Sequence, residues 1–259
     1  MSIWQDWNPA VSARDMSLFP EISIIIPAFN KESCVEKTLQ EVVQVIESTN
    51  FSFEIIIVDD FSTDKTLERI RNSNIPQLRI LTNEKNFGKG YSIRKGISCC
   101  LATKYTGYVD ADLDIKPDAL LTAIKCLEED QSIGICIGSK FHFSSIVQST
   151  RLRRIQSYCF ASLFKLLFKL DILDSQTGLK LGRVEEFRHL VSQTQIHGFA
   201  FDVELLFLAH QKEVRIAEIP ITLSGNYLTT IGIMSSIRSV YDLFAIHRRL
   251  SRFVARKGR

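Results

Sequence analysis

The sequence predicts an α/β fold with a Rossmann-like, mostly parallel central sheet flanked by helices. Short apolar runs alternate with segments whose apolar residues recur at helical spacing, and the connections between them are short. In addition, the apolar runs end in polar or glycine-containing residues. Sheets of this kind bind ligands beyond the carboxyl ends of their strands, so the pattern that predicts the fold also predicts where a site lies.

The first half of the chain contains the clearest strands, which are apolar enough to be covered on both faces. They are expected at Ile22–Pro27, Phe53–Val58, Leu78–Leu81 and Tyr105–Val109. Helices are expected between them, at residues 33–48, from the capping residues Ser62-Thr63-Asp64 to about Arg71, and at residues 89–102.

The second half continues with less regular alternation. We expect strands at Ile133–Ile137, after the segment that starts at Asp174, and at Val214–Pro220. Helices are expected from Pro117 to about Glu129, at residues 151–170, around Arg183–Leu190 and from Gly198 to about Lys212. A last amphipathic helix is expected at Ile237–Phe253. Residues 1–20 are interpreted as an N-terminal arm, residues 21–222 as one domain, and residues 223–259 as a C-terminal amphipathic helix with a basic tail.

Composition excludes several classes of protein. The net charge of +3 is too small to indicate a nucleic-acid partner. The six cysteines have no CxxC spacing, which indicates reduced thiols of a cytoplasmic protein and not a zinc site or a disulfide framework. No secretory signal opens the chain, and no apolar run reaches the length of about 18 residues that spans a bilayer. We therefore expect a protein that is soluble or lies on a membrane surface.

Carboxylates crowd the end of the strand at Tyr105–Val109. Asp110, Asp112 and Asp114 follow it directly, and such a group of anions beside a buried strand is costly unless a cation lies among them. A divalent metal with oxygen ligands, carrying the phosphates of a nucleotide, is one explanation. Turn and helix-capping chemistry is the alternative, because Asp-x-Asp also serves there.

Three other strand ends are polar as well, namely those at Pro27–Glu32, Asp59-Asp60 and Asn83–Gly90. Neither a GxGxxG dinucleotide motif nor a GxxxxGK[ST] phosphate loop is present. Gly88 and Gly90 can still let the backbone approach a phosphate, with Lys89 as a point charge, although a glycine-rich helix start would look the same.

The helix at residues 151–170 combines basic and apolar residues. Arg154, Lys165 and Lys169 fall on one helix face beside a broad apolar surface, which suits a helix lying in a membrane interface. A core or dimer helix with outward-reaching lysines is the alternative. The basic tail after Ile237–Phe253 fits an anionic membrane surface or plain solvation equally well.

Taken in order, these motifs resemble the inverting family 2 glycosyltransferases, which have the GT-A fold. The resemblance is carried by Pro27-Ala28-Phe29-Asn30-Lys31-Glu32, Val58-Asp59-Asp60, Asn86-Phe87-Gly88-Lys89-Gly90 and Asp110-Ala111-Asp112. Downstream motifs resemble polyprenyl-phosphate glycosyltransferases, with the dolichyl-phosphate glucosyltransferase-like branch nearest and the dolichyl-phosphate mannose synthases next. They are Gly138-Ser139-Lys140, Arg153-Arg154, Asp174 to Lys180, Phe201 to Leu205 and Glu218-Ile219-Pro220. The resemblance covers residues 21 to about 222.

The resemblance implies a role for each matching residue. The nucleotide would be bound by Pro27, Phe29, Glu32, Asp60, Lys89, Asp110 and Ala111. Asp110 and Asp112 would be the catalytic carboxylates, and Asp112 with Asp114 would bind Mg²⁺ or Mn²⁺. Donor or acceptor phosphates and the acceptor would be contacted by Lys140, Arg153, Arg154, Gln176, Thr177, Lys180 and Asp202.

Three departures from the family pattern matter. Asp114 stands where many relatives have glutamine, the segment at residues 224–230 lacks the basic residues common after the preceding strand, and the transmembrane helices of many relatives are missing. We therefore expect amphipathic segments, a membrane-anchoring partner or a homo-oligomer to bring the chain to the lipid.

The function implied by the resemblance is transfer of a hexose, with glucose from UDP-glucose as the first expectation, to a polyprenyl (dolichyl or undecaprenyl) phosphate at the cytoplasmic face of a membrane. The alternatives are a dolichyl-phosphate mannose synthase that uses GDP-mannose, a GT-A transferase acting on a sugar hydroxyl, and a nucleotide-sugar-binding subunit without catalysis. A phosphate monoester is already anionic at neutral pH, because its second pKa is about 6. Only a hydroxyl acceptor would therefore need a general base such as Asp202.

Overall fold

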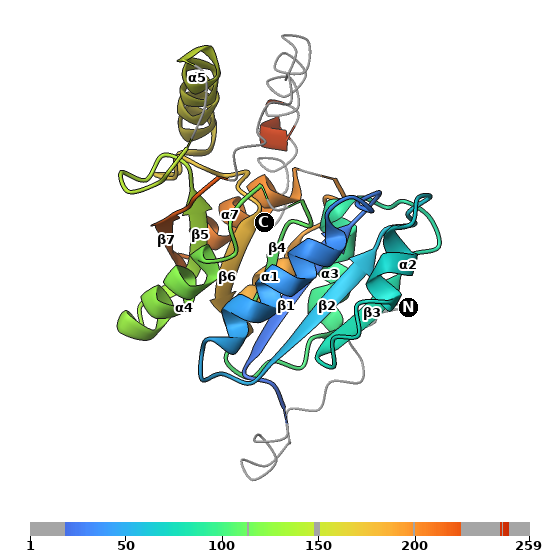
Figure 1. Cartoon of the computed structure of the whole chain (residues 1–259). Coiled ribbons are helices and arrows are strands. Elements are labelled where there is room, and N and C mark those ends of the chain that lie inside the picture. Colours follow the sequence, from blue (N-terminus) through green and yellow to red (C-terminus); the bar gives the residue numbers. More distant parts are fainter. Residues whose placement is uncertain are drawn as a thin grey trace.

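Figure 1 shows the computed structural model of the chain. It describes residues 19–112, 114–147, 151–198, 200–223, 244 and 246–248. Within the helix at residues 151–168, it describes the side chains of Tyr158 and of residues 161–168. Residues 1–18 of the expected arm at residues 1–20, the segment at residues 224–230 and most of the expected helix at Ile237–Phe253 lie outside the described residues.

The described residues form one seven-stranded sheet in the order β3-β2-β1-β4-β6-β5-β7. The strands are β1 (Ile22–Ala28), β2 (Phe53–Asp59), β3 (Leu78–Thr82), β4 (Tyr105–Val109), β5 (Ile133–Ser139), β6 (Leu179–Arg183) and β7 (Arg215–Pro220). β1 pairs in parallel with β2 and β4, and β2–β3 and β5–β7 are parallel as well. β6 alone among them is antiparallel to both of its neighbours, so the expected mostly parallel sheet is confirmed.

Helices cover both faces of this sheet (Figure 1). They are α1 (Val35–Glu47), α2 (Thr66–Arg71), α3 (Lys89–Cys99), α4 (Ala119–Glu129), α5 (Arg151–Phe168), α6 (Val184–Gln193) and α7 (Phe201–Gln211). Apolar residues of α1, α2 and α4 form one core with Ile24 and Ile26, while α3, α6 and α7 form the other with Ile25. Successive strand residues point to opposite faces, so an uninterrupted isoleucine run supplies both cores. Each fully buried isoleucine contributes about 1.5–3 kcal/mol.

The direction of β6 places its preceding loop beside the end of β4. Val109, the last residue of β4, pairs with Leu179, the first residue of β6. The loop before Leu179 therefore reaches the edge at which β1, β2 and β4 end. β5 is also antiparallel to β6, so Lys140, which follows it, comes to the same edge. The sheet thus gathers the polar strand ends that the sequence predicted to converge.

α5 rises beyond this edge of the sheet (Figure 1). Phe164 and Phe168 anchor its lower part in the core, where Phe168 packs edge-on against Phe207 of α7, with 6.0 Å between ring centroids. Lys165 and Leu166, in contrast, are exposed. The helix expected at residues 151–170 is confirmed, with its end two residues earlier.

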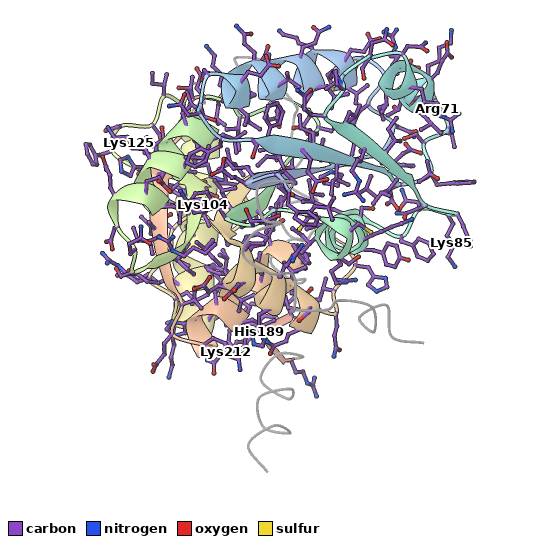
Figure 2. All side chains as sticks on the ribbon, turned by 90° about the horizontal axis from the view of Figure 1, so that it is seen from below. Arg71, Lys85, Lys104, Lys125, His189 and Lys212 are labelled. Atoms are coloured by element: carbon purple, nitrogen blue, oxygen red, sulfur yellow. The ribbon has the colours of Figure 1, made fainter. Side chains whose placement is uncertain are left out.

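The opposite end of the molecule is seen in Figure 2. Arg71 and Lys125 come from different parts of the fold and lie toward opposite sides of this view, whereas Lys104 lies nearer its middle. Lys104 pairs with Glu128 at 2.9 Å, which is a surface interaction at that end. The converging strand ends therefore lie away from this face.

Candidate active site

Asp110 is held at the end of β4 by two contacts, and its neighbour Ala111 by two more. Its backbone N–H donates to the carbonyl oxygen of Gly178 at 2.9 Å, and its Oδ1 atom lies 2.7 Å from the Nζ atom of Lys89. The next residue, Ala111, is buried, and its carbonyl accepts hydrogen bonds from Thr38 Oγ1 at 2.8 Å and from Cys34 Sγ at 3.3 Å. These contacts fix the backbone that carries Asp112.

Asp112 and Asp114 extend this carboxylate group into a pocket. An Asp112 carboxylate oxygen lies 3.1 Å from Lys31 Nζ, and both side chains are about one-third exposed. The Asp114 N–H points to the other oxygen of Asp112 at 3.4 Å. All three expected carboxylates, Asp110, Asp112 and Asp114, line the same pocket.

The pocket is formed by residues that follow β4, β5 and β7, by the loop before β6 and by α1. Its lining consists of Thr38, Val42, Val109, Asp110, Asp112, Asp114, Ile115, Pro117, Lys140, Asp174, Gln176, Thr177, Gly178, Leu179, Ile221 and Leu223. Lys140 is the basic member of this lining. The pocket thus combines acidic groups for a cation with one ammonium group for an anion.

Lys140 is positioned by a buried carboxylate. Asp174, which is 2% exposed, accepts a hydrogen bond from the Lys140 backbone N–H at 2.8 Å and one from Lys140 Nζ at 3.2 Å. Glu218 of β7 in turn accepts the Asp174 N–H at 3.2 Å. Three segments whose motifs resemble polyprenyl-phosphate glycosyltransferases are therefore joined near Lys140, whose side chain is 31% exposed.

A charged network lies beneath the pocket. Lys89 Nζ lies 3.3 Å from Asp202 Oδ2 in addition to its contact with Asp110. Lys180 Nζ lies 2.7 Å from Asp202 Oδ1 and donates to the Thr177 carbonyl at 2.8 Å. The Tyr108 hydroxyl also donates to Asp202. Asp202 and Lys180, both expected to contact the acceptor, are 2% and 0% exposed and lie in the interior.

The environment shifts the pKa of each member of this network. Burial alone would raise the pKa of Asp202, but Lys180 and Lys89 together lower it by more than burial raises it. The net shift in the pKa of Asp202 is therefore downward. For Lys89 the two carboxylates outweigh burial and raise its pKa, whereas burial dominates at Lys180 and lowers its pKa. Burial also raises the pKa of Tyr108 well above its usual value. Ionised Asp202 is therefore stabilised, and the phenol stays protonated.

At Asp110 the balance is different. Burial raises the pKa of its carboxyl group, the Lys89 ammonium opposes this, and Asp202 adds to the rise, so that the net shift is upward. An added cation near Asp110 would therefore offset an unfavourable charge.

The loops after β1 and β2 support each other. Asn30 has a left-handed backbone (φ 51°), and its side-chain oxygen accepts the Thr63 N–H at 2.9 Å. Glu32 accepts the Lys65 N–H at 2.9 Å. Phe29 is 41% exposed, which leaves its ring accessible to a stacking base. Pro27, which was also expected near the nucleotide, is partly exposed within β1.

Asp60 was expected to accept an N–H from a nucleotide base, and the structure gives its carboxylate other donors. It is 3% exposed and accepts hydrogen bonds from Asn83 Nδ2 at 2.6 Å, Phe87 N at 3.0 Å and Gly88 N at 2.7 Å. Gly88 has a φ of 97°, and a Cβ there would meet the His197 carbonyl oxygen at 2.7 Å. Asp60 therefore shapes the loop that positions Lys89.

The donor set fits a hard divalent cation. Among the described residues no group of three or more His, Cys, Asp or Glu side chains is arranged to hold a metal ion by itself. Mg²⁺ in nucleotide sites usually takes one or two carboxylates and completes its shell with phosphates and water. Asp112 and Asp114, in one pocket beside Asp110, match that demand.

Four further residues were expected to contact the acceptor or the phosphates. Gln176 is exposed and Thr177 is buried, and both line the pocket. Arg153 and Arg154 lie on α5, but their side chains lie outside the described residues. Sequence reasoning did not identify Lys31, Tyr108 or Asp174 as parts of the site. Lys31 and Asp174 lie within motifs that carry the family resemblance, and Tyr108 lies two residues before Asp110, so position in or near a motif was the signal for them.

Comparison with known proteins places these features in a wider group. Residues 23–191 match the model of the family described as glycosyl transferase family 2. A dolichyl-phosphate beta-glucosyltransferase of Dictyostelium discoideum is 32% identical over 248 residues, which cover 88% of this chain and 74% of that protein. A dolichyl-phosphate beta-glucosyltransferase of Drosophila melanogaster is 31% identical and covers 87% of this chain and 74% of its own length.

Solved structures share the fold at lower identity. Glucosyl-3-phosphoglycerate synthase from Mycobacterium tuberculosis, in complex with UDP, superposes with a TM-score of 0.67 at 16% identity, over 93% of this chain and 86% of that chain. The same protein in complex with Mn²⁺, UDP and glucosyl-3-phosphoglycerate gives a TM-score of 0.65 at 17% identity, over 93% of this chain and 85% of that chain.

Proposed function

This chain belongs to glycosyl transferase family 2, and we propose that it transfers glucose from UDP-glucose to the phosphate of dolichyl phosphate. The relatives at 32% and 31% identity bear that activity in their names. The observation that carries the proposal is the pocket in which Asp110, Asp112 and Asp114 lie with Lys140, because a transfer between two phosphorylated substrates needs groups for both.

A divalent ion is part of this proposal. Asp112 and Asp114 would hold Mg²⁺ or Mn²⁺, which when bound offsets the charge that develops on the departing diphosphate. Support comes from their place in the pocket and from the Mn²⁺ and UDP bound by the M. tuberculosis enzyme, which has the same fold.

The donor would lie along the edge formed by β1, β2 and β4. Phe29 offers an exposed ring on which a base can stack, and Glu32 lies on the same loop. Asp60 acts through the backbone of Phe87 and Gly88, which it fixes. Lys89 keeps the carboxylate of Asp110 at 2.7 Å and so maintains the turn that presents Asp112.

The acceptor phosphate would be bound near Lys140. Asp174 holds the Lys140 ammonium at 3.2 Å without burying it, so this cation can pair with an incoming anion. Gln176 and Thr177 line the same pocket, which supports their expected role beside the acceptor.

The position of Asp202 favours a phosphate acceptor over a sugar hydroxyl. A hydroxyl acceptor needs a general base within reach of its proton, but Asp202 is 2% exposed and binds Lys89, Lys180 and Tyr108. A phosphate monoester is already anionic at neutral pH, because its second pKa is about 6. It can attack the anomeric carbon without such a base.

Contact with a membrane surface is proposed for α5 and the loop after β5. Phe143, Ile146, Tyr158 and Leu166 are 94%, 61%, 50% and 75% exposed. The Phe141 ring packs against Tyr158 with 4.8 Å between centroids, so that the loop and the helix present their apolar residues together. Exposed apolar groups of this kind near basic residues favour a lipid interface.

No helix in the part of the chain that the structure describes is both long and apolar enough to cross a membrane.

A transfer assay tests the proposal. The purified chain is incubated with dolichyl phosphate, Mg²⁺ or Mn²⁺ and radiolabelled UDP-glucose, with GDP-mannose in a parallel reaction, and organic-soluble label is identified. We expect lipid-linked glucose from UDP-glucose and little product from GDP-mannose. Lipid-linked mannose would select the mannose synthase alternative, and the absence of product with either donor would overturn the proposal.

A further inference from the structure

Lys31 makes an ion pair with the carboxylate that is proposed to bind the metal. Its Nζ atom lies 3.1 Å from Asp112 Oδ2. We propose that Lys31 competes with the divalent cation for Asp112, so that tight metal binding requires the nucleotide diphosphate to be present. This inference rests on the metal role of Asp112 in the proposed function.

The backbone of Lys31 is fixed, so only its side chain can move away from Asp112. The Lys31 N–H donates to Thr66 Oγ1 at 2.7 Å, and the Lys31 carbonyl accepts hydrogen bonds from Cys34 N at 3.1 Å and Val35 N at 2.9 Å. A lysine stem has several rotatable bonds. The ammonium can therefore leave Asp112 while the loop between β1 and α1 keeps its conformation.

Lys89 and Lys31 differ in how firmly they are held. Lys89 is 8% exposed and lies between two carboxylates, those of Asp110 and Asp202. Lys31 is 34% exposed, and Asp112 is the carboxylate with which it pairs. Of these two lysines next to the acidic pocket, Lys31 is the one that an arriving cation can displace.

The electrostatics favour exchange over coexistence. Burial lowers the pKa of Lys31, but Asp112, Cys34 and Asp110 together raise it, and the net shift is upward, so the ammonium is charged at neutral pH. A divalent ion on the same carboxylate would repel this ammonium. A diphosphate supplies further negative charge, which lets both cations remain at the site. Lys31 would then pair with a phosphate oxygen.

The test is a measurement of Mn²⁺ affinity by electron paramagnetic resonance, with and without UDP. In the absence of UDP, we expect Lys31→Gln to bind Mn²⁺ about tenfold more tightly than the unmodified chain, as one removed charge near a protein surface allows. We also expect UDP to improve Mn²⁺ binding by a smaller factor in this variant. Lys31→Arg, which keeps the charge, should behave like the unmodified chain.

Lys37→Gln is the matched control. It removes the same charge from α1, where Lys37 is 72% exposed and pairs with Glu41 at 3.6 Å, and it should leave Mn²⁺ affinity unchanged. Equal or weaker Mn²⁺ binding by Lys31→Gln would overturn the inference and make the contact an ordinary surface ion pair. Lipid-linked glucose formed by the unmodified chain would then still uphold the proposed function. Tighter Mn²⁺ binding by Lys31→Gln, together with no glucose transfer by the unmodified chain, would uphold this inference and contradict only the proposed function.

Discussion

The Nζ atom of Lys89 lies 2.7 Å from Asp110 Oδ1 in the pocket, and the same atom lies 3.3 Å from Asp202 in the core. One buried lysine therefore connects the acidic turn after β4 with the first turn of α7. Through Asp202 this connection continues to Lys180 and Tyr108. A change at Asp202 acts on the pocket through Lys89, although Asp202 itself does not line it.

Asp202→Asn should destabilise the fold. The substitution leaves Lys180 without a carboxylate partner among the contacts described and leaves Lys89 with Asp110 alone. Removing one partner of a buried ion pair costs about 3–5 kcal/mol, which urea denaturation would measure. Glu36→Gln, which breaks the half-exposed pair with Arg69, is the control and should change the free energy of unfolding much less. An unchanged free energy in Asp202→Asn would contradict the structural role.

The same carboxylate should make stability depend on acid pH. The net shift lowers the pKa of Asp202 in the folded chain below its unfolded value of about 3.9. Its contribution is therefore fully present above about pH 4, and it is lost as the pH falls through the lower, folded pKa. The free energy of unfolding between pH 2 and pH 6 should fall less steeply in Asp202→Asn than in the unmodified chain. Parallel curves would exclude Asp202 as a source of the acid dependence.

Asp112→Ala should abolish transfer and leave the fold intact. Asp112 is one-third exposed, so its removal costs little packing, whereas a lost metal ligand removes stabilisation of the departing diphosphate. We expect turnover to fall at least about 100-fold, which corresponds to about 3 kcal/mol, with an unchanged melting temperature. Asp118→Ala replaces an exposed aspartate just before α4 and should retain activity. Substantial turnover in Asp112→Ala would refute the metal assignment.

Gly178 should tolerate no side chain. A Cβ atom there would lie 2.1 Å from Asp110 Oδ2, so Gly178→Ala must displace the carboxylate or the loop before β6. Overpacking of this kind typically costs about 1–3 kcal/mol, and we expect nucleotide affinity measured by calorimetry to fall about tenfold or more. Gly198→Ala is the control, because a Cβ at Gly198 meets no atom within 4 Å. Equal UDP affinity in both variants would show that Asp110 does not depend on this close approach.

The fold was predictable because its strands have distinctive sequences. The isoleucine runs of β1 and β2 are apolar on both faces, which only a covered sheet accommodates. The position of β6 was not predictable in this way, since Leu179–Arg183 contains Lys180 and an antiparallel insertion leaves no mark in the sequence. Periodicity gives an element's type but not its neighbours.

The site was predictable in part. Asp110, Asp112 and Asp114 could be placed together because a strand end followed by carboxylates is a local pattern. Ion pairs between distant segments depend on the packed structure instead. Lys31 and Asp112 are 81 residues apart, and Tyr108 and Asp202 are 94 residues apart. Lys180 is likewise held in the interior by a contact with Asp202, 22 residues away, which the sequence alone does not reveal.

Membrane contact by the α5 region should depend on its exposed apolar side chains. Phe143 and Leu166 are 94% and 75% exposed, so Phe143→Ser with Leu166→Ser removes apolar surface without opening the core. Burial of apolar area contributes about 25 cal/mol per Å², and we expect the double variant to bind vesicles of phosphatidylcholine and phosphatidylserine at least about tenfold more weakly in sedimentation. The single variant Leu101→Ser is the control. Leu101 is 45% exposed and lies just before β4, which begins at the end of the sheet opposite the pocket. Equal vesicle binding by the double variant and the unmodified chain would show that this surface does not contact the membrane.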